Sequence, residues 1–133
     1  MDSNLVYPTL VEIIEYNRRT LIEFKVKKAD SHKVLNEAAI KYVISKAKET
    51  TGDTYDKAVI LLKGLVQNHP FASGNRRTAL VTTERFLEKN NLKLHVKGGE
   101  EQARILQGIR ENYYLDSEIK TWLIRGKIRE FQR

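Results

Sequence analysis

The stretch Thr54-Tyr-Asp-Lys-Ala-Val-Ile-Leu-Leu-Lys-Gly-Leu-Val-Gln-Asn68 decides the fold of this chain. Its apolar side chains lie almost all around a helix instead of along one stripe, which predicts a central, buried helix. Asp53 or Thr54 can cap its start. Its end is expected at Asn68-His69-Pro70, because a residue that precedes proline disfavours the α conformation. The other helices are therefore expected to pack around this one.

Helical spacing of apolar residues continues on both sides of this segment. Five further helices are expected, roughly at residues 8–24, 34–48, 75–89, 100–112 and 116–128, with Pro8 in the first turn of the earliest. Residues 25–33 are polar and basic, which predicts a mobile loop, and the alternation over residues 92–96 predicts a short extended segment. The predicted fold class is all-α: a single domain over residues 1–133, built as a bundle of about six helices with a loop between the two central ones.

The composition is that of a globular domain and excludes several kinds of site. Hydrophobic residues make up 41% and charged residues 31% of the 133 residues. Cysteine is absent, which excludes disulfides, Cys-ligated zinc, Fe–S clusters and a cysteine nucleophile. No apolar run reaches membrane-spanning length, and the stretch from Met1 to Leu10 lacks the pattern of a signal peptide, so a cytoplasmic protein without membrane contact is expected.

The distribution of charge indicates an anionic partner. The chain has 24 Lys and Arg against 17 Asp and Glu, a net charge of +7. No acidic residue occurs between Asp56 and Glu84. The cations of that interval are Lys57, Lys63, Arg76 and Arg77. A polyphosphate ligand or a nucleic acid fits this pattern, and charge alone does not choose between them.

The loop between the two central helices combines a phosphate site with a base. The first turn of the helix that begins near Asn75 has unpaired N–H groups and the positive end of the helix dipole. Gly74 lets the backbone approach a ligand closely, and Arg76 and Arg77 add positive charge. A neutral imidazole at His69, across the loop, can accept a proton from an attacking hydroxyl. This combination favours phosphoryl or nucleotidyl transfer.

A nucleic-acid-binding protein is the alternative that the charge leaves open. Two helices around a loop superficially suggest a helix-turn-helix. The connection from His69 to Gly74 is longer than that motif's turn of about 3–4 residues, and its arginines precede an exposed helix face instead of lining it. Binding to nucleic acid is therefore not expected.

The segment His69-Pro-Phe-Ala-Ser-Gly-Asn-Arg-Arg-Thr-Ala79 resembles the signature loop of the Fic/Doc family, His-x-Phe-x-Asp/Glu-Gly-Asn-Gly/Lys-Arg, which the Doc (death-on-curing) branch continues with Thr-Ala. Residues 56–69 and 79–94 are similar to the helices on either side of that loop, and residues 117–123 resemble the family's closing helix. The resemblance is specific over residues 53–95 and weaker toward both ends. It implies an all-α fold, in agreement with the helical spacing.

The resemblance also implies an enzyme that uses ATP and Mg²⁺ and transfers part of the nucleotide to a hydroxyl of a target protein. Each matching residue takes the role of its counterpart in the family motif. The implied roles are general base for His69, phosphate pairing for Arg77, anion hole for Gly74, Asn75 and Arg76, and buried loop anchor for Phe71.

Two positions favour the Doc branch, whose members transfer a phosphate, over the members that transfer AMP. Arg76 stands where the AMP-transferring pattern has a second glycine, and Leu80 stands where it has a second arginine. The resemblance therefore implies transfer of the terminal phosphate of ATP by a toxin of a toxin–antitoxin pair, with a translation factor as one candidate target. AMP transfer to a protein hydroxyl stays as the alternative within the family.

An inhibitory motif is not completed in this sequence. The family pattern is Ser/Thr-x-x-x-Glu-Gly/Asn, and the nearest match, from Ser45 to Glu49, is followed by Thr50. An antitoxin or inhibitor is therefore expected to be a separate chain.

Ser73 departs from the family pattern, which has an acidic Mg²⁺ ligand at this position. A hydroxyl is a weaker ligand than a carboxylate for this cation. Ser73 then either reaches the metal directly or through water, or it only caps the next helix and the metal is lost together with catalysis. A catalytically degenerate member that binds a nucleotide or a protein is a further candidate function.

Overall fold

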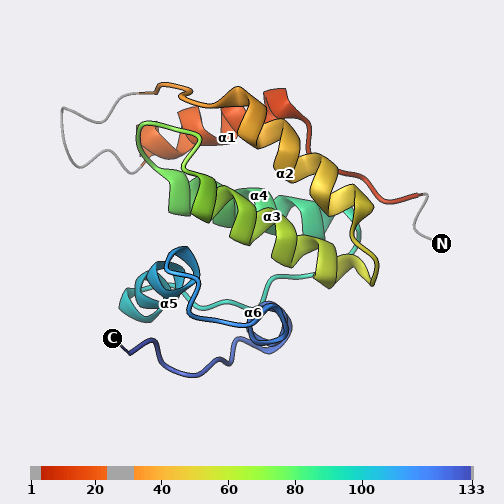
Figure 1. Cartoon of the computed structure of the whole chain (residues 1–133), viewed down its shortest axis with the longest axis vertical. Helices are drawn as coiled ribbons and strands as arrows, with labels where there is room; N and C mark the ends of the chain where they lie inside the picture. The colour runs from red at the N-terminus through yellow and green to blue at the C-terminus, as the bar shows by residue number, and fades with distance from the viewer. Residues whose placement is uncertain (1–3, 24–31, 133) are drawn as a thin grey trace.

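Residues 4–23 and 32–132 are described by the structure, a computed structural model, and they confirm the all-α class (Figure 1). Six helices follow one another along them: α1 (Leu10–Glu23), α2 (Glu37–Glu49), α3 (Thr54–Asn68), α4 (Asn75–Lys89), α5 (Glu100–Arg110) and α6 (Asp116–Arg125). Within these two ranges no strand forms, and an isolated antiparallel bridge joins Val34 to Phe71. The mobile loop predicted at 25–33 lies outside the described residues except for its last two positions.

The central helix is α3, as its all-round apolar pattern predicts. Figure 1 shows α1 and α2 on one side of α3, α4 alongside it, and α5 with α6 on the opposite side. Its buried apolar residues lie on several faces: Ala58, Val59, Leu61, Leu62, Leu65 and Val66. A Cβ at Gly64 would lie 2.7 Å from a Val43 methyl of α2, so glycine permits these two helices to approach closely.

A reciprocal cap fixes the start of α3. Asp53 Oδ1 accepts the N–H of Asp56 at 3.0 Å, and Asp56 Oδ2 accepts the N–H of Asp53 at 2.8 Å. Lys120 Nζ of α6 lies 3.2 Å from the first carboxylate and 3.0 Å from the second. Both predicted ends of α3 are confirmed, with Asp53 as the cap.

The first helix begins later than predicted. Thr9 and Glu12 form a reciprocal cap, in which the N–H of Thr9 donates to Glu12 Oε1 at 2.9 Å and the N–H of Glu12 donates to Thr9 Oγ1 at 3.1 Å. The helix therefore starts at Leu10, and Pro8 lies before the cap and not in the first turn.

The second helix also begins later than predicted, at Glu37 and not at Val34. Asn36 caps it by accepting the N–H of Ala39 at 3.0 Å. The N–H groups of Leu35 and Asn36 instead donate to the carbonyl of Pro70, at 2.8 and 3.1 Å. The residues that were expected to form the first turn of α2 thus contact the loop between α3 and α4 instead.

The C-terminal helices are shorter than predicted. α5 ends at Arg110 because Asn112, where it was expected to end, adopts a left-handed conformation with φ 57°. α6 ends at Arg125 because Gly126, with φ 70°, terminates it before Ile128. Residues 92–96 form no strand with any described residue. They run along α6, where the N–H of His95 donates to the carbonyl of Leu123 at 3.1 Å.

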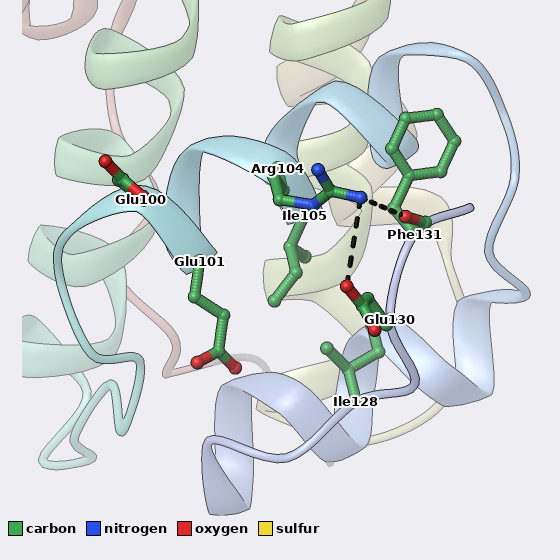
Figure 2. Close-up of a pocket in the computed structure, with 7 residues that line it drawn as sticks. All are labelled: Glu100, Glu101, Arg104, Ile105, Ile128, Glu130 and Phe131. Atoms are coloured by element: carbon green, nitrogen blue, oxygen red, sulfur yellow. Dashed lines mark hydrogen bonds and ion pairs between the residues drawn. The ribbon is translucent and has the colours of Figure 1, made fainter. Parts of the chain in front are cut away.

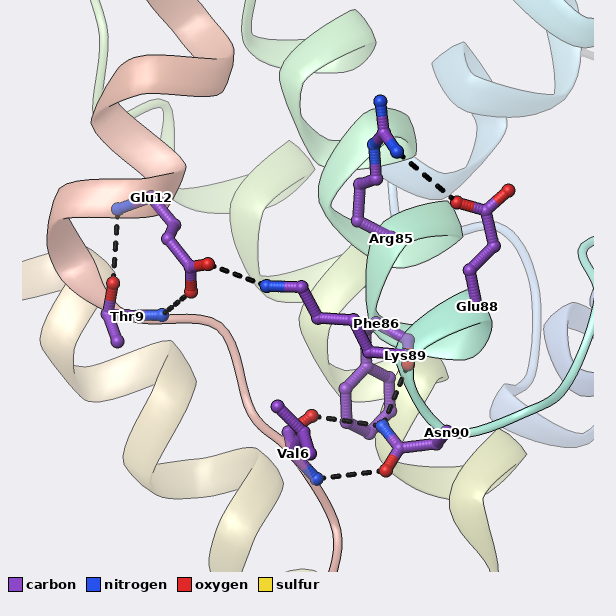
Figure 3. Close-up of polar contacts among 8 residues, drawn as sticks. All are labelled: Val6, Thr9, Glu12, Arg85, Phe86, Glu88, Lys89 and Asn90. Atoms are coloured by element: carbon purple, nitrogen blue, oxygen red, sulfur yellow. Dashed lines mark hydrogen bonds and ion pairs between the residues drawn. The ribbon is translucent and has the colours of Figure 1, made fainter.

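Polar contacts attach the residues before α1 to the end of α4 (Figure 3). The Asn90 side chain accepts the N–H of Val6 and donates to its carbonyl, each at 2.9 Å. Lys89 Nζ donates to Glu12 Oε2 at 2.6 Å. These contacts fix α1 along α4.

None of the helices that the structure describes is long and apolar enough to cross a membrane.

Lys57 is buried inside the bundle, with 4% of its surface exposed. Its Nζ donates to the carbonyls of Ala47, Lys48 and Thr50, at 3.3, 3.4 and 2.5 Å. These carbonyls end α2, so Lys57 stabilises the C-terminus of that helix. Lys57, one of the four cations of the acid-free interval, is therefore not exposed to bind a ligand.

We predict that Lys57→Met lowers the free energy of unfolding by about 2–3 kcal/mol, because the carbonyls at the end of α2 lose a buried, charged donor. Urea denaturation measures the change. Lys63→Met is the control, since Lys63 forms a partly exposed ion pair with Asp116 at 2.8 Å, and pairs of this kind contribute less than about 1 kcal/mol. Equal effects of the two variants would contradict the capping role.

Candidate active site

The loop between α3 and α4 has a left-handed residue at each end. His69 (φ 47°, ψ 57°) ends α3, and Gly74 (φ 77°, ψ 18°) caps α4. A Cβ on Gly74 would lie 3.1 Å from Leu21 Cδ2 and 3.3 Å from Asn17 Nδ2, so both the positive φ and the packing against α1 require glycine. Ser73 is not the cap of α4, which corrects one of the two roles expected for it.

The backbone of this loop is hydrogen-bonded from two directions. The Asn75 side chain accepts the N–H of Phe71 at 3.0 Å and donates to its carbonyl at 2.8 Å. On the other side, the N–H of Ala72 donates to the carbonyl of Lys33 at 2.9 Å. Phe71 lies in the core beneath the loop, 2% exposed. The Asn75 side chain is therefore engaged by the loop, and it is its backbone N–H, in the first turn of α4, that is suited to contact an anion.

A buried asparagine of α1, which the sequence analysis missed, joins three segments at this point. Asn17 is fully buried. Its Nδ2 donates to the carbonyl of Ser73 at 2.9 Å and to Thr78 Oγ1 at 3.0 Å, and its Oδ1 lies 3.0 Å from His32 Nδ1. A polar residue one helical turn after the buried Ile13 was the signal that could have revealed it.

The imidazole of His69 is held at the edge of the cleft in its neutral form. The Nδ2 of Asn75 lies 3.4 Å from its Nδ1, and its Nε2 is buried without a hydrogen-bond partner among the described residues. Burial, and after it the positive charges of Arg110 and Arg76, lower the pKa of His69 below its ordinary value of 6.5. The ring is therefore uncharged at pH 7 and able to accept a proton.

Three arginines line the cleft, of about 330 Å³, together with this imidazole. The residues that line the cleft are His69, Ala72, Ser73, Gly74, Asn75, Arg76, Arg77 and Arg110. Arg110 comes from the last turn of α5 and was not anticipated from the sequence. The convergence of three guanidinium groups on a helix N-terminus makes the cleft suited to a phosphate.

The three guanidinium groups are held differently. Arg76 is half-buried and donates to Gln107 Oε1 of α5. Burial, and after it the charge of Arg110, lower the pKa of Arg76, with Glu111 acting in the opposite direction. Arg77 is exposed on the same turn of α4. Arg76 is thus positioned by α5, whereas Arg77 lies at the open side of the cleft.

The donor set of the cleft does not fit a Mg²⁺ ion held by protein ligands. Its lining residues include no carboxylate, and the described part of the chain contains no group of three His, Asp or Glu side chains that could hold a metal. Three guanidinium groups repel a dication, and one serine hydroxyl is a weak ligand. The role of Ser73 at a metal therefore stays a prediction without a second protein ligand to support it.

A second pocket, of about 410 Å³, lies between the start of α5 and the C-terminal tail (Figure 2). Its lining residues are Glu100, Glu101, Arg104, Ile105, Ile128, Glu130 and Phe131. Arg104 donates to the carbonyl of Phe131 at 2.8 Å and lies 3.8 Å from the Glu130 carboxylate. With three glutamates against one arginine, this pocket repels phosphate and is not a second anion site.

The site residues predicted from the sequence come together, whereas two other cations of the acid-free interval lie elsewhere. His69, Ser73 and the stretch from Gly74 to Arg77 all line the cleft, and Phe71 lies beneath it. Lys57 is buried at the end of α2, and Lys63 pairs with Asp116, so the acid-free interval does not form one basic surface. This dispersal agrees with a local phosphate site more than with an extended nucleic-acid interface.

We predict that His69→Asn leaves the protein at least as stable, with a gain of up to about 1 kcal/mol, because asparagine tolerates the left-handed conformation better than histidine. The other non-glycine residues with positive φ among those described are both asparagines, Asn91 (φ 64°) and Asn112 (φ 57°).

The reverse change, Asn91→His, provides the matched control and is expected to destabilise. Urea denaturation of both variants measures the difference. A loss of more than about 1 kcal/mol in His69→Asn would show that His69 has a structural role.

The comparisons with known proteins agree with this geometry. No curated protein matches the chain. The model of the Fic/DOC family matches residues 9–87, which is more than half of the chain and extends from the cap of α1 almost to the end of α4. Asn17, α3, the loop after it and α4 up to residue 87 lie inside the matched range, whereas Arg110 lies outside it. The chain therefore belongs to the Fic/DOC family.

Proposed function

We propose that this protein is a Doc-like transferase that moves the terminal phosphate of ATP to a hydroxyl of a target protein. Membership of the Fic/DOC family implies a protein-modifying transferase. The observation that carries the proposal is the uncharged His69 imidazole at the edge of a cleft lined by three arginines. Such a cleft supplies both a base and charge neutralisation for phosphoryl transfer.

The proposed step is a direct displacement at phosphorus. The hydroxyl oxygen of the target forms a bond to the γ-phosphorus while the bond from that phosphorus to the β–γ bridging oxygen breaks, and ADP leaves. The hydroxyl proton passes to the unprotonated ring nitrogen of His69. Arg76, Arg77 and the N–H groups of the first turn of α4 neutralise the charge on the phosphate oxygens.

Two side chains favour phosphate over AMP transfer. Arg76 occupies the position of the second glycine in the AMP-transferring pattern and is held by Gln107. Leu80, at the position of that pattern's second arginine, packs against the core. The second arginine clamp is therefore missing, and the nucleotide is free to bind in the opposite sense and present its terminal phosphate.

The proposed biological setting is a toxin of the cytoplasm, with a translation factor as a candidate target and a separate antitoxin chain. The incomplete inhibitory pattern supports a separate inhibitor. Glu49 is the last residue of α2, and the loop contacts the residues just before that helix. The length of α2, about 20 Å at 1.5 Å per residue, separates this carboxylate from the cleft.

We predict that incubation with a cell lysate transfers label to protein from γ-labelled ATP and not from α-labelled ATP. The physical reason is that only the terminal phosphorus is attacked. Gel separation and counting measure the label, with His69→Asn as the inactive control. Label from α-labelled ATP alone would instead establish AMP transfer, the alternative within the family.

Substitution of Arg77 is predicted to weaken ATP binding, whereas substitution of His69 is predicted to slow transfer. Arg77→Ala removes a charge-assisted phosphate contact worth about 2–3 kcal/mol, so ATP binding weakens by about a hundredfold. His69→Asn retains ATP binding but loses transfer by about 10²–10⁴-fold, because a base acts in the transition state.

Calorimetric titration with ATP, beside the transfer assay, separates these two effects. Arg85→Ala is the control, since Arg85 lies on the same helix outside the cleft and pairs with Glu88 at 3.6 Å. Parent-like ATP binding by a folded Arg77→Ala variant would mean that phosphate binds elsewhere.

A second candidate function is nucleotide binding without transfer. Ser73, in a cleft with no carboxylate among its described lining residues, is the observation that favours it. If the parent binds ATP and transfers nothing while Ser73→Asp is active, this second function replaces the first.

A further inference from the structure

We propose that this cleft binds a triphosphate without a protein-held metal ion, and that Arg110 supplies the positive charge that Mg²⁺ provides in relatives with an acidic residue at the position of Ser73. The nucleotide in this inference rests on the proposed function. The anion site itself rests on the described contacts of α3, α4 and α5.

Two contacts place the last turn of α5 beside the loop. Gln67 Nε2 of α3 donates to the carbonyl of Ile109 at 2.8 Å and lies 3.3 Å from Asn112 Oδ1. Arg76 of α4 donates to Gln107 of α5. Arg110 follows Ile109 directly, so its position beside the cleft is fixed through two neighbouring helices.

Arg76 and Arg110 bring positive charge to the cleft, whose described lining residues include no carboxylate. Arg110 lies close enough to His69 and Arg76 to lower the pKa of each. The described residues give Arg110 no hydrogen-bond or ion-pair partner. The carboxylate that acts on this cluster, Glu111, is exposed, lies outside the cleft and accepts a hydrogen bond from Gln107 Nε2. The charges of Arg76 and Arg110 oppose each other, so an anion bound between them would be favoured.

Guanidinium groups can neutralise the charge of phosphates, which is one function of a bound metal ion. Proteins usually hold a dication at nucleotide phosphates with one or two carboxylates, and the described lining has none. Arginine stays charged at every physiological pH and presents a planar set of donors that matches phosphate oxygens. Arg110 and the rest of α5 lie outside the matched range of the family model.

A simpler role for Arg110 is to stabilise α5, since a cation in the last turn of a helix interacts favourably with the helix dipole. Arg125 occupies the same position on α6, is exposed, and does not line the cleft. Arg125→Gln is therefore a matched control for Arg110→Gln, because both remove a cation from the end of a helix.

Calorimetric titrations of the full chain with ATP and with inorganic tripolyphosphate, each in EDTA and in excess Mg²⁺, test the inference. We expect both ligands to bind in EDTA at least as tightly as with Mg²⁺. Arg110→Gln should weaken binding in EDTA by about tenfold, whereas Arg125→Gln should leave it unchanged. Ser73→Asp should bind weakly in EDTA and recover with Mg²⁺, because the new carboxylate repels phosphate and also provides a metal ligand.

The outcomes distinguish this inference from the proposed function. Binding by the parent only in Mg²⁺, or equal effects of Arg110→Gln and Arg125→Gln, would overturn the inference and leave the transferase proposal standing. Binding of tripolyphosphate but not of ATP would support the arginine site and overturn the use of ATP. A folded parent that binds neither ligand would overturn both.

Discussion

The buried side chain of Asn17 is the interaction on which the cleft depends. One amide joins α1 to the carbonyl of Ser73 in the loop and to Thr78 of α4. A buried carbonyl left without its donor costs roughly 1–3 kcal/mol, so the loop cannot move away from α1 cheaply. The close approach of Gly74 to α1 follows from this contact, and the direction of the first turn of α4 follows from Gly74. The backbone of α4 at Arg76 and Arg77 thus depends on α1, whereas α5 holds the Arg76 side chain.

Two cleft residues, His69 and Arg76, are held in unfavourable environments, and the rest of the bundle compensates. His69 adopts a left-handed conformation and has a buried Nε2 without a partner among the described residues. Arg76 is partly buried beside Arg110. Conformational strain and unsatisfied polar groups collect at functional sites where surrounding structure holds them in place. Here that structure is the buried helix α3, with its reciprocal Asp53 cap, and the α2 end that Lys57 stabilises.

The parts of the fold that the sequence predicted are those whose signals are local. α3 and α4 have the predicted bounds because a proline, a capping residue and a glycine mark their ends. The start of α2 was predicted too early because residues 33–36 bond to the loop that follows α3, and no local pattern shows such a contact. The first helix was predicted to start at Pro8, but the reciprocal cap formed by Thr9 and Glu12 starts it at Leu10.

The same distinction applies to the candidate site. The residues from His69 to Arg77 were predicted together because they are consecutive in the sequence. Asn17 and Arg110 reach the site from other helices, so only the three-dimensional structure brings them there. Lys57 was counted among the cations of the acid-free interval because its charge is visible in the sequence and its burial is not.

Asn17 is far in the sequence from its hydrogen-bond partners, and this distance affects the order in which the protein folds. Its hydrogen bonds to Ser73 and Thr78 join residues 56 and 61 positions apart, whereas α3 and α4 are neighbours in the chain and pack directly. Local contacts form faster than distant ones, so the α3–α4 hairpin is expected to condense before α1 closes on the loop. Arg110 is synthesised later still. A growing chain on the ribosome therefore completes its cleft only after α5 has been made.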